Sequence, residues 1–254
     1  MSRIQDDLIT IIGSAYLQPI ADLIDRLIQR KHVRPTRIQS THHECGYCAA
    51  GVILLVAMFE SYVSRLRYTC PKPESALKRN AIDIVLSVFP RLRHREALRD
   101  VYILRDILMH AHLWEIKYEW GGPVPMVLKD ATLHPAYGDT KYQSRVDPLA
   151  RRTKTLKLSV IPTRIDRRDL LKVFDTVWKT LLRFESVKWF MCNIPHQRVR
   201  FRGKAVTFEC LRDEIEASLQ NRSQEVRLEL LSSLVSSSLI KRRPGLTVLP
   251  RFHP

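Results

Sequence analysis

Apolar side chains recur every three to four residues through long stretches of this chain, and this spacing constrains the fold more than any other feature. The stretches span residues 7–30, 44–67, 74–89, 93–115 and 164–191. Such spacing places the apolar side chains on one face of an α-helix, and that face has to be buried against other helices. The sequence therefore predicts a mainly α-helical fold, a bundle of about four to five helices.

The chain over residues 114–162 departs from the helical pattern. Three short runs, Trp114–Trp120, Pro125–Leu128 and Thr155–Ile161, are separated there by glycines and prolines. Runs of this kind are typical of strands joined by turns. We therefore expect a small β-hairpin or β-sheet insertion in the bundle.

These patterns divide the chain into three parts. Residues 1–40 are expected to form an N-terminal helical element and a linker, and residues 41–194 the helical bundle with its β insertion. Residues 195–254 are expected to form a β-hairpin and a helical extension. The reason is that alternating residues flank Arg202 and Gly203 before helical spacing returns.

Basic residues greatly outnumber acidic ones. The chain has 42 Lys and Arg against 26 Asp and Glu, which gives a formal net charge of +16. An excess of this size is typical of proteins that bind a polyanion, and nucleic acid is the first candidate. The alternative is that the charge only keeps the protein soluble, which requires a smaller excess.

Cysteine usage and the start of the chain indicate the cytoplasm. The 5 cysteines are an odd number and do not form a dense secreted framework. Residues 1–7 lead into an amphipathic pattern rather than the apolar region of a signal peptide. The most apolar run, Cys45–Phe59, is shorter than the roughly 20 residues that span a bilayer. We expect it to be a buried helix, with no membrane partner.

Several common catalytic motifs are absent from the sequence. It contains no P-loop, no G-x-G-x-x-G, no H-E-x-x-H and no G-x-S-x-G, which argues against a nucleotide-driven motor or a zinc peptidase. His42, His43, Cys45 and Cys48 are of zinc-ligand type, but no second paired motif accompanies them. Cys48 also enters an apolar helix, where cysteine is an ordinary small hydrophobe. We expect no metal and no cofactor.

The most informative segment is Arg105-Asp106-Ile107-Leu108-Met109-His110, near the end of a predicted helix. It resembles the R-x4-6-H motif of the HEPN superfamily, in which a polar Asn, Asp or His often follows the arginine. The order of elements over roughly residues 44–192 is also similar to that family. The resemblance implies a metal-independent endoribonuclease with Arg105 and His110 as catalytic residues. The alternative is a solvated arginine and a histidine favoured by the helix dipole.

An arginine and a histidine suit the cleavage of RNA by its own ribose 2′-hydroxyl. A histidine that titrates near neutral pH accepts the 2′-hydroxyl proton or donates one to the departing 5′-oxygen. A guanidinium stabilises the extra charge on the phosphate oxygens. Because DNA lacks the 2′-hydroxyl, this route restricts the substrate to RNA.

Two carboxylates are candidate members of the same site. Asp106 could orient Arg105 or His110, or raise the pKa of the histidine through its negative charge; otherwise it is a solvated helix acid. Glu60 interrupts an apolar helix and resembles the polar residue that many HEPN domains direct toward the motif. The alternative is a surface carboxylate paired with a neighbouring arginine.

The spacing of the motif creates a geometric difficulty. Residues five apart on an α-helix point about 140° away from each other, so one helix presents Arg105 and His110 poorly to one phosphate. The resemblance implies a homodimer that brings two motifs into one groove. His112 is the alternative histidine, because a residue seven positions from Arg105 lies on the same helix face.

Further basic and aromatic residues are expected to dock the RNA. The predicted RNA-binding residues are Arg151, Arg152, Lys154, Arg167, Arg168, Arg200 and Arg202. Aromatic side chains in or near the β insertion could stack on bases. They are Trp114, Tyr118, Trp120, Tyr137 and Tyr142.

These features together predict a ribonuclease that acts as a toxin or as an effector of antiviral defence, as HEPN enzymes of this kind often do. The resemblance then implies an antitoxin or a sensor protein as partner. Two alternatives stay open. One is a HEPN-like module that binds RNA or protein without cutting, and the other is a DNA-binding regulator, although no clear helix-turn-helix is present.

Overall fold

The computed structural model describes most of the chain between residues 12 and 220. The described residues are 12–36, 39–70, 80–110, 114–120, 126–133, 140–187, 190 and 192–220, with only the backbone described at 114–116, 126–129, 131–133 and 141. Predictions for residues 1–11 and 221–254 lie outside this part of the chain.

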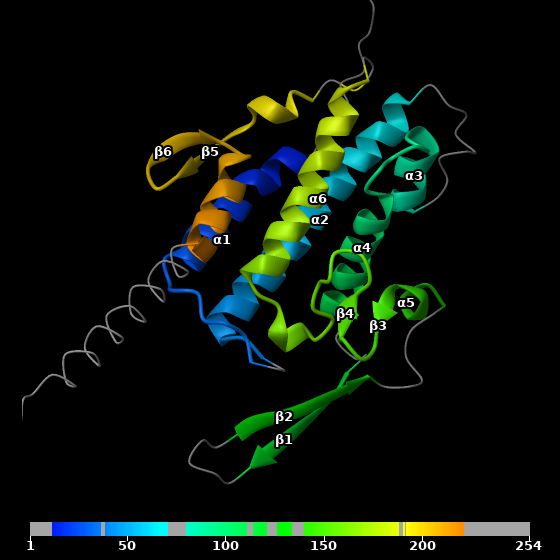
Figure 1. The fold of residues 1–254 in the computed structure, drawn as a ribbon. Helices are drawn as coiled ribbons and strands as arrows, with labels where there is room; N and C mark the ends of the chain where they lie inside the picture. Colours follow the sequence, from blue (N-terminus) through cyan, green and yellow to red (C-terminus); the bar gives the residue numbers. More distant parts are fainter. Residues whose placement is uncertain are drawn as a thin grey trace, which may run out of the picture.

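A long central helix organises the fold. α2 (His42–Thr69) contacts both α1 (Leu17–Ile28) and α6 (Arg167–Glu185). α4 (Arg95–His110) packs against α2 and α6, and the short α3 (Ala81–Val88) contacts α2 and α4. Figure 1 shows α6 lying over α2, with α1 and α4 on opposite sides. The expected mainly α-helical class is confirmed.

Side-chain caps fix where the helices begin. Oγ1 of Thr41 accepts the backbone N–H of Glu44 at 3.2 Å at the start of α2. Oδ1 of Asp166 accepts the N–H of Arg168 at 2.9 Å at the start of α6. Each cap satisfies a backbone donor that the helix itself leaves open. The Asp166 cap explains why α6 begins at Arg167 rather than at residue 164.

The core is densest where α2 meets α6. At Gly51 the two helices approach so closely that a Cβ atom there would lie 3.0 Å from Cδ1 of Leu170. Aromatic rings fill another part of this interface, where the ring centroids of Phe59 and Phe184 are 5.8 Å apart. Both rings are fully buried, so the contact removes a large apolar area from water.

One core spans the three predicted parts of the chain. Ile20 and Ile24 of α1 belong to the same buried cluster as Phe59, and so do Phe208 and Ile215 near the C-terminal end of the described chain. The predicted boundaries after residues 40 and 194 therefore divide the sequence but not the core.

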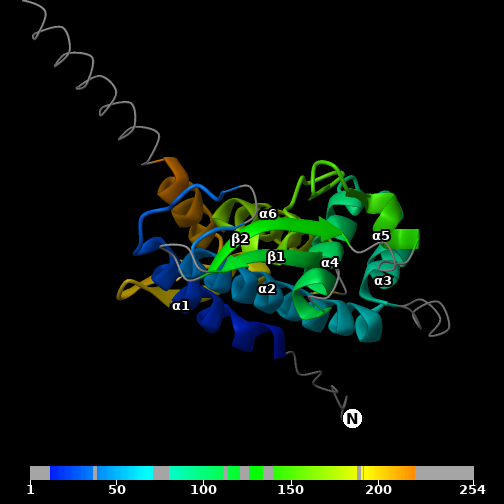
Figure 2. The same cartoon turned by 90° about the horizontal axis from the view of Figure 1, so that it is seen from below.

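The predicted β insertion is present, and its first strand has the predicted bounds. β1 (Trp114–Trp120) pairs antiparallel with β2 (Met126–Leu133). Figure 1 shows this hairpin extending beyond the end of α4, and Figure 2 shows its two strands side by side in the view from below. The hairpin therefore projects from the helical core.

The rest of the insertion differs from the prediction. Two strands of two residues each, β3 (Val146–Asp147) and β4 (Arg152–Thr153), lie ahead of the segment Thr155–Ile161. The segment itself is not a strand. The reason is a buried carboxylate: Oδ2 of Asp100 accepts the backbone N–H groups of Thr155 and of the next residue, both at 2.8 Å. These donors are therefore not available to a strand ladder.

Short elements complete the described chain. They are η1 (Ile12–Tyr16), α5 (Thr140–Arg145), η3 (Pro162–Arg164), η4 (Ile194–His196), β5 (Arg198–Phe201) and β6 (Lys204–Thr207), and residues 210–220 are helical. The predicted hairpin around Arg202 and Gly203 is confirmed. These two residues have φ values of 47° and 76°, as a tight two-residue turn requires. α5 had not been predicted.

α2 is long and apolar enough to cross a bilayer by length and composition alone. The helix has 28 residues, which is close to the predicted stretch 44–67 and longer than its most apolar run Cys45–Phe59. Half of its most apolar window is buried inside the molecule, and the core helix of a soluble protein gives the same signal. With Leu55 and Phe59 fully buried, α2 has the contacts of a core helix.

Candidate functional site

α4 places a polar cluster beside α2. The apolar side of α4, which includes Leu98, Val101 and Leu104, is fully buried in the core. Tyr102 and Arg105 are three positions apart, so they share the neighbouring, partly exposed side of the helix. Helical periodicity therefore turns Arg105 toward the edge of the core, where it meets α2.

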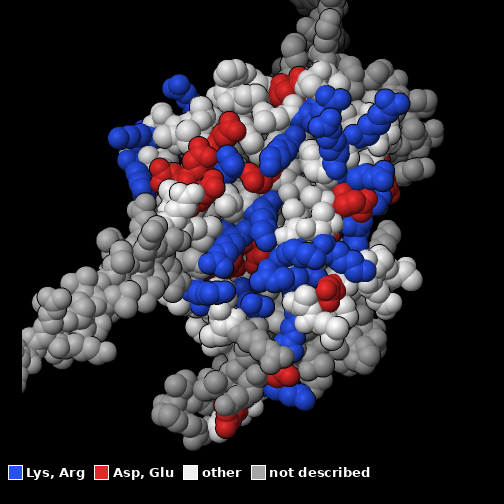
Figure 3. Space-filling model, viewed as in Figure 1, with Lys and Arg blue, Asp and Glu red and all other residues white. Residues whose placement is uncertain are grey.

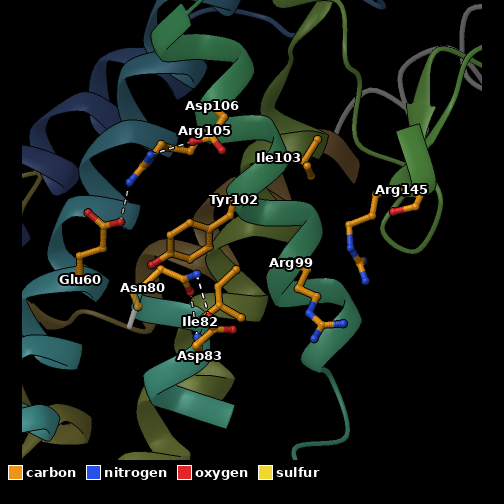
Figure 4. A pocket seen from close by; sticks show the side chains of 12 residues that line it. Glu60, Asn80, Ile82, Asp83, Arg99, Tyr102, Ile103, Arg105, Asp106 and Arg145 are labelled. Atoms are coloured by element: carbon orange, nitrogen blue, oxygen red, sulfur yellow. Dashed lines mark hydrogen bonds and ion pairs between the residues drawn. The ribbon is translucent and has the colours of Figure 1, made fainter. Parts of the chain in front are cut away.

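Arg105 binds both of the predicted carboxylates. Its Nη2 atom lies 2.6 Å from Oε1 of Glu60, and its Nη1 atom lies 2.7 Å from Oδ1 of Asp106. Figure 4 shows the guanidinium reaching from α4 toward Glu60 on α2. The predicted proximity of Glu60 to the motif is confirmed, whereas the roles of the two carboxylates in catalysis stay predictions.

The surroundings keep Arg105 charged. Partial burial opposes the charged form, but the hydrogen bond and the negative charge of Glu60, together with Asp106, raise the pKa of Arg105. The side chains of Arg105 and Glu60 are 30% and 36% exposed, so solvent screens the pair. Arg105 is therefore an oriented and partly exposed cation.

Tyr102 belongs to the same cluster and was missed by sequence reasoning. Cζ of Arg105 lies 5.5 Å from the centre of the Tyr102 ring, which is within cation–π distance. The Tyr102 hydroxyl is buried and faces the Glu60 carboxylate. Burial raises the pKa of Tyr102, so the phenol stays neutral. The position of Tyr102 one helical turn before Arg105 is the sequence feature that could have predicted their proximity.

A cavity of about 520 Å³ lies beside this cluster. The residues that line it are Glu60, Asn80, Ala81, Ile82, Asp83, Arg99, Tyr102, Ile103, Arg105, Asp106, Ser144 and Arg145. Figure 4 shows Glu60 and Arg105 on one side and Arg99 and Arg145 on the other. We call it the Arg105 cavity. Its volume is in the range of small-ligand pockets.

Arg145, on the far side of the Arg105 cavity, holds α5 against α4. Arg145 donates to the Glu96 carboxylate, and its Nη1 atom lies 3.3 Å from Oδ1 of the fully buried Asp100. Nη1 of Arg99 lies 3.1 Å from Oε1 of Glu96. The hydrogen bond from Arg145 lowers the pKa of Glu96. These contacts give Arg145 a structural role.

The predicted catalytic histidine lies elsewhere. His110 is in the last turn of α4, its side chain is exposed, and it is not among the described residues that line the Arg105 cavity. The five-residue separation on one helix accounts for this placement. One copy of the chain therefore does not bring Arg105 and His110 together. His112 lies outside the described residues.

The predicted RNA-binding residues differ in exposure. The exposed ones are Lys154, Arg168, Arg200 and Arg202. Arg151 and Arg152 are partly buried. Nη2 of Arg151 lies 2.9 Å from Oδ1 of Asp130, and Arg152 donates to the carbonyl oxygen of Lys157 at 2.6 Å. These two arginines thus already have partners within the chain.

The prediction that Arg167 binds RNA is wrong. Its side chain is 1% exposed, and its Nη2 and Nε atoms lie 2.7 Å and 2.8 Å from the carboxylate oxygens of Glu44. Nη2 also donates to the carbonyl oxygens of Leu27 and Arg30, both at 3.1 Å. Arg167 therefore joins α6 to α2 and to the end of α1 inside the molecule.

The aromatic residues that were predicted to stack on bases also differ in exposure. Tyr118 and Trp120 on β1 are 43% and 71% exposed, and their ring centroids are 6.4 Å apart. Tyr142 is buried, so the idea that it stacks on bases is wrong. Tyr137 and the side chain of Trp114 lie outside the described residues.

Basic side chains gather on one face of the molecule. Figure 3 shows many Lys and Arg side chains over the face that α6 occupies in Figure 1. Arg168, Lys172, Lys179 and Arg183 lie on α6 at spacings that bring them to one side of the helix. The last three were missed because they are a turn or more apart and form no run of basic residues.

The His and Cys residues at the start of α2 contact protein atoms. Nε2 of His43 lies 3.1 Å from the carbonyl oxygen of Arg26, and Cys45 donates through Sγ to the carbonyl oxygen of Pro162 at 3.0 Å. Burial raises the pKa of the Cys48 thiol. Within the described part of the chain, no group of three or more His, Cys, Asp or Glu side chains could hold a metal ion.

No protein-family model matches the chain, and no curated protein or solved structure matches it either. The function has to be inferred from the Arg105 cavity, the basic face and the sequence.

Proposed function

We propose that the chain is a metal-independent endoribonuclease in which Arg105 binds the scissile phosphate of RNA and the ribose 2′-hydroxyl is the nucleophile. The observation that carries the proposal is a partly exposed guanidinium, oriented by Glu60 and Asp106, beside a cavity. The net charge of +16 supports a nucleic-acid substrate.

The roles of the residues follow from their charge and position. Arg105 stabilises the extra negative charge that the phosphate oxygens gain in the transition state. Glu60 and Asp106 hold the guanidinium in one orientation, so less positioning remains to be done when substrate binds. Tyr102 supplies a neutral hydroxyl beside the same guanidinium.

The proton-transfer group of the proposed reaction is His110 of a second copy of the chain. The exposed place of His110 at the end of α4 suits contact with a partner surface better than contact with the Arg105 cavity of its own copy. In a two-fold dimer each cavity would receive the histidine of the other copy, which gives two equivalent sites. His112 is the alternative histidine for this role.

A non-catalytic RNA-binding module is the second candidate. The observation that favours it is that two carboxylates already neutralise Arg105. Such a cluster can hold α4 against α2 without any reaction. RNA would then bind the basic face over α6, and no bond would be cut.

The biological setting is also part of the proposal. We place the enzyme in the cytoplasm, as a toxin or an antiviral-defence effector that an antitoxin or a sensor protein controls. The support is the likeness of residues 105–110 to the HEPN motif together with the basic charge.

The decisive experiment is an RNA-cleavage assay in excess EDTA. Purified wild-type protein is expected to cut mixed RNA and leave 2′,3′-cyclic phosphate ends, whereas Arg105→Ala and His110→Ala should not cut. Arg26→Ala is the control, because it removes an exposed arginine of α1 that lies outside the Arg105 cavity. Binding without cleavage by the wild type would favour the second candidate, and a preference for one duplex DNA would favour a DNA-binding regulator.

A further inference from the structure

A second, smaller pocket lies at the start of α6. It has a volume of about 240 Å³ and is lined by cationic side chains from three segments: Arg34 ahead of α2, Arg152 on β4, and Arg164, Arg168 and Lys172 around the start of α6. We call it the α6 pocket. Figure 3 shows Lys and Arg side chains gathered in this part of the face, with a small acidic area between them.

Three cations of the α6 pocket have no hydrogen-bond or ion-pair partner in the described chain. Within those residues, no hydrogen bond or ion pair holds the side chain of Arg164, Arg168 or Lys172. Burial lowers the pKa of Lys172, and burial together with the charge of Arg152 lowers the pKa of Arg164. The charged forms are thus less stable here than in water, and a bound anion would stabilise them.

Two carboxylates that are held by the protein itself also line the α6 pocket. Oδ1 of Asp166 caps α6, and Oδ1 of Asp169 accepts the backbone N–H of Ser159 at 3.2 Å. Burial and the charge of Asp166 raise the pKa of Asp169 to about 6. Because five cations outnumber these two acids, the pocket keeps a positive charge.

The size and chemistry of the α6 pocket restrict its ligand. Its volume is below the roughly 300–1,000 Å³ of pockets that enclose a whole small molecule, so it suits one small anionic group. Guanidinium groups bind phosphate through paired, charge-assisted hydrogen bonds. Lys179 and Arg183 follow farther along α6 on the same side, so basic charge continues beyond the pocket.

We propose that the α6 pocket is a phosphate-binding site that holds one phosphate group of a bound RNA strand. The phosphate chemistry follows from the pocket, whereas the choice of RNA over free phosphate rests on the proposed function. Arg164 and Lys172 are the residues on which the site depends most, because both are partly buried and neither has a described ion-pair partner.

The test measures RNA binding separately from RNA cutting. A labelled single-stranded 2′-O-methyl RNA has no free 2′-hydroxyl and cannot be cut by the proposed reaction, and its Kd for the full chain is measured at several salt concentrations. Arg164→Ala and Lys172→Gln should each weaken binding about tenfold. Each should also reduce the slope of log K against log salt by about one.

The matched control is Arg26→Ala, which removes an exposed arginine of α1 outside the α6 pocket. Equal Kd values and salt slopes for this control and the two pocket variants would overturn the proposal. Melting temperatures show whether the variants fold, and both pocket variants should melt at or above the wild type because burial disfavours the charged form of each side chain.

A second arm distinguishes RNA from free phosphate. Inorganic phosphate alone is added, and the melting temperatures of the wild type and of Arg164→Ala are compared. A phosphate-dependent rise only in the wild type, with unchanged RNA binding by Arg164→Ala, would overturn the assignment to RNA. Cleavage by Arg105 plays no part in either arm, so failure of the proposed function is detected separately.

Discussion

Oε1 of Glu60 lies 2.6 Å from Nη2 of Arg105, and this contact joins α2 to α4 across 45 positions of the sequence. A free arginine side chain samples many rotamers, and fixing it costs about 2 kcal/mol of rotamer entropy. Glu60 on one side and Asp106 on the other leave the guanidinium in one orientation. A phosphate that enters the Arg105 cavity therefore meets a group that is already positioned.

Replacing Glu60 should affect the proposed cleavage more than stability. Glu60→Ala removes the orientation of Arg105 and should lower the single-turnover rate about ten- to a hundredfold, whereas Glu60→Gln keeps an acceptor oxygen and should lose less. The free energy of unfolding should change by less than about 1 kcal/mol, because the pair is partly exposed. Equal rate losses for Ala and Gln would contradict a positioning role.

Replacing Arg167 should destabilise the fold strongly. Its partner Glu44 is 3% exposed, so Arg167→Ala leaves a buried carboxylate without its cation. The free energy of unfolding should fall by about 3–5 kcal/mol, measured by urea denaturation. Arg168→Ala is the matched control because the neighbouring Arg168 is exposed, and its effect should stay within about 0.5 kcal/mol. Similar losses for the two variants would contradict the buried pair.

The helices were predictable because their signals are local. α2, α4 and α6 lie within a few residues of the stretches with helical apolar spacing, and the turn at Arg202 and Gly203 was marked by its own residues. The class of fold and the first strand of the insertion followed from the same kind of pattern.

The partners of individual side chains were not predictable from spacing. Arg167 and Arg168 are adjacent and chemically identical, yet Glu44 and two carbonyl oxygens far away in the sequence bury only Arg167. The segment Thr155–Ile161 forms no strand for a similar reason, because Asp100 on α4 accepts two of its backbone N–H groups. The Glu60 contact was expected only from the family resemblance, because no local pattern connects Glu60 with Arg105.

Asp169 should make stability depend on pH. Burial is the largest cause of the rise of its pKa from 3.8 to about 6; Asp166 adds to the rise, while the N–H of Ser159 and the charges of Lys172 and Arg152 oppose it. The folded state therefore binds this proton more tightly than the unfolded state does. The stability it contributes is present below about pH 4 and is lost as the pH rises through about 6.

Asp169→Asn should remove the loss of stability at high pH, because the amide stays neutral. It also keeps an acceptor oxygen for the backbone N–H of Ser159. At about pH 7.5 the variant should be more stable than the wild type by at most about 3 kcal/mol, and the difference should shrink toward zero near pH 4. Melting curves of both proteins across this range provide the measurement. A difference that stays constant with pH would contradict the raised pKa.

Mixing Arg105→Ala with His110→Ala should restore cleavage that neither variant has alone. If each site combines Arg105 of one copy with His110 of the other, a mixed dimer holds one site with both residues intact. Equal amounts of the two chains give half mixed dimers, so about one quarter of the wild-type activity should return. Coexpression of the two variants ensures that the copies mix, and the EDTA cleavage assay measures the recovery.

The double variant Arg105→Ala/His110→Ala is the control, since its mixture with either single variant contains no complete site and should stay inactive. Should the mixture of single variants also stay inactive although each pairs with the wild type, Arg105 and His110 would have to act within one copy. That outcome would require the two side chains to reach one phosphate from directions about 140° apart on α4. It would therefore refute the composite site built from two copies.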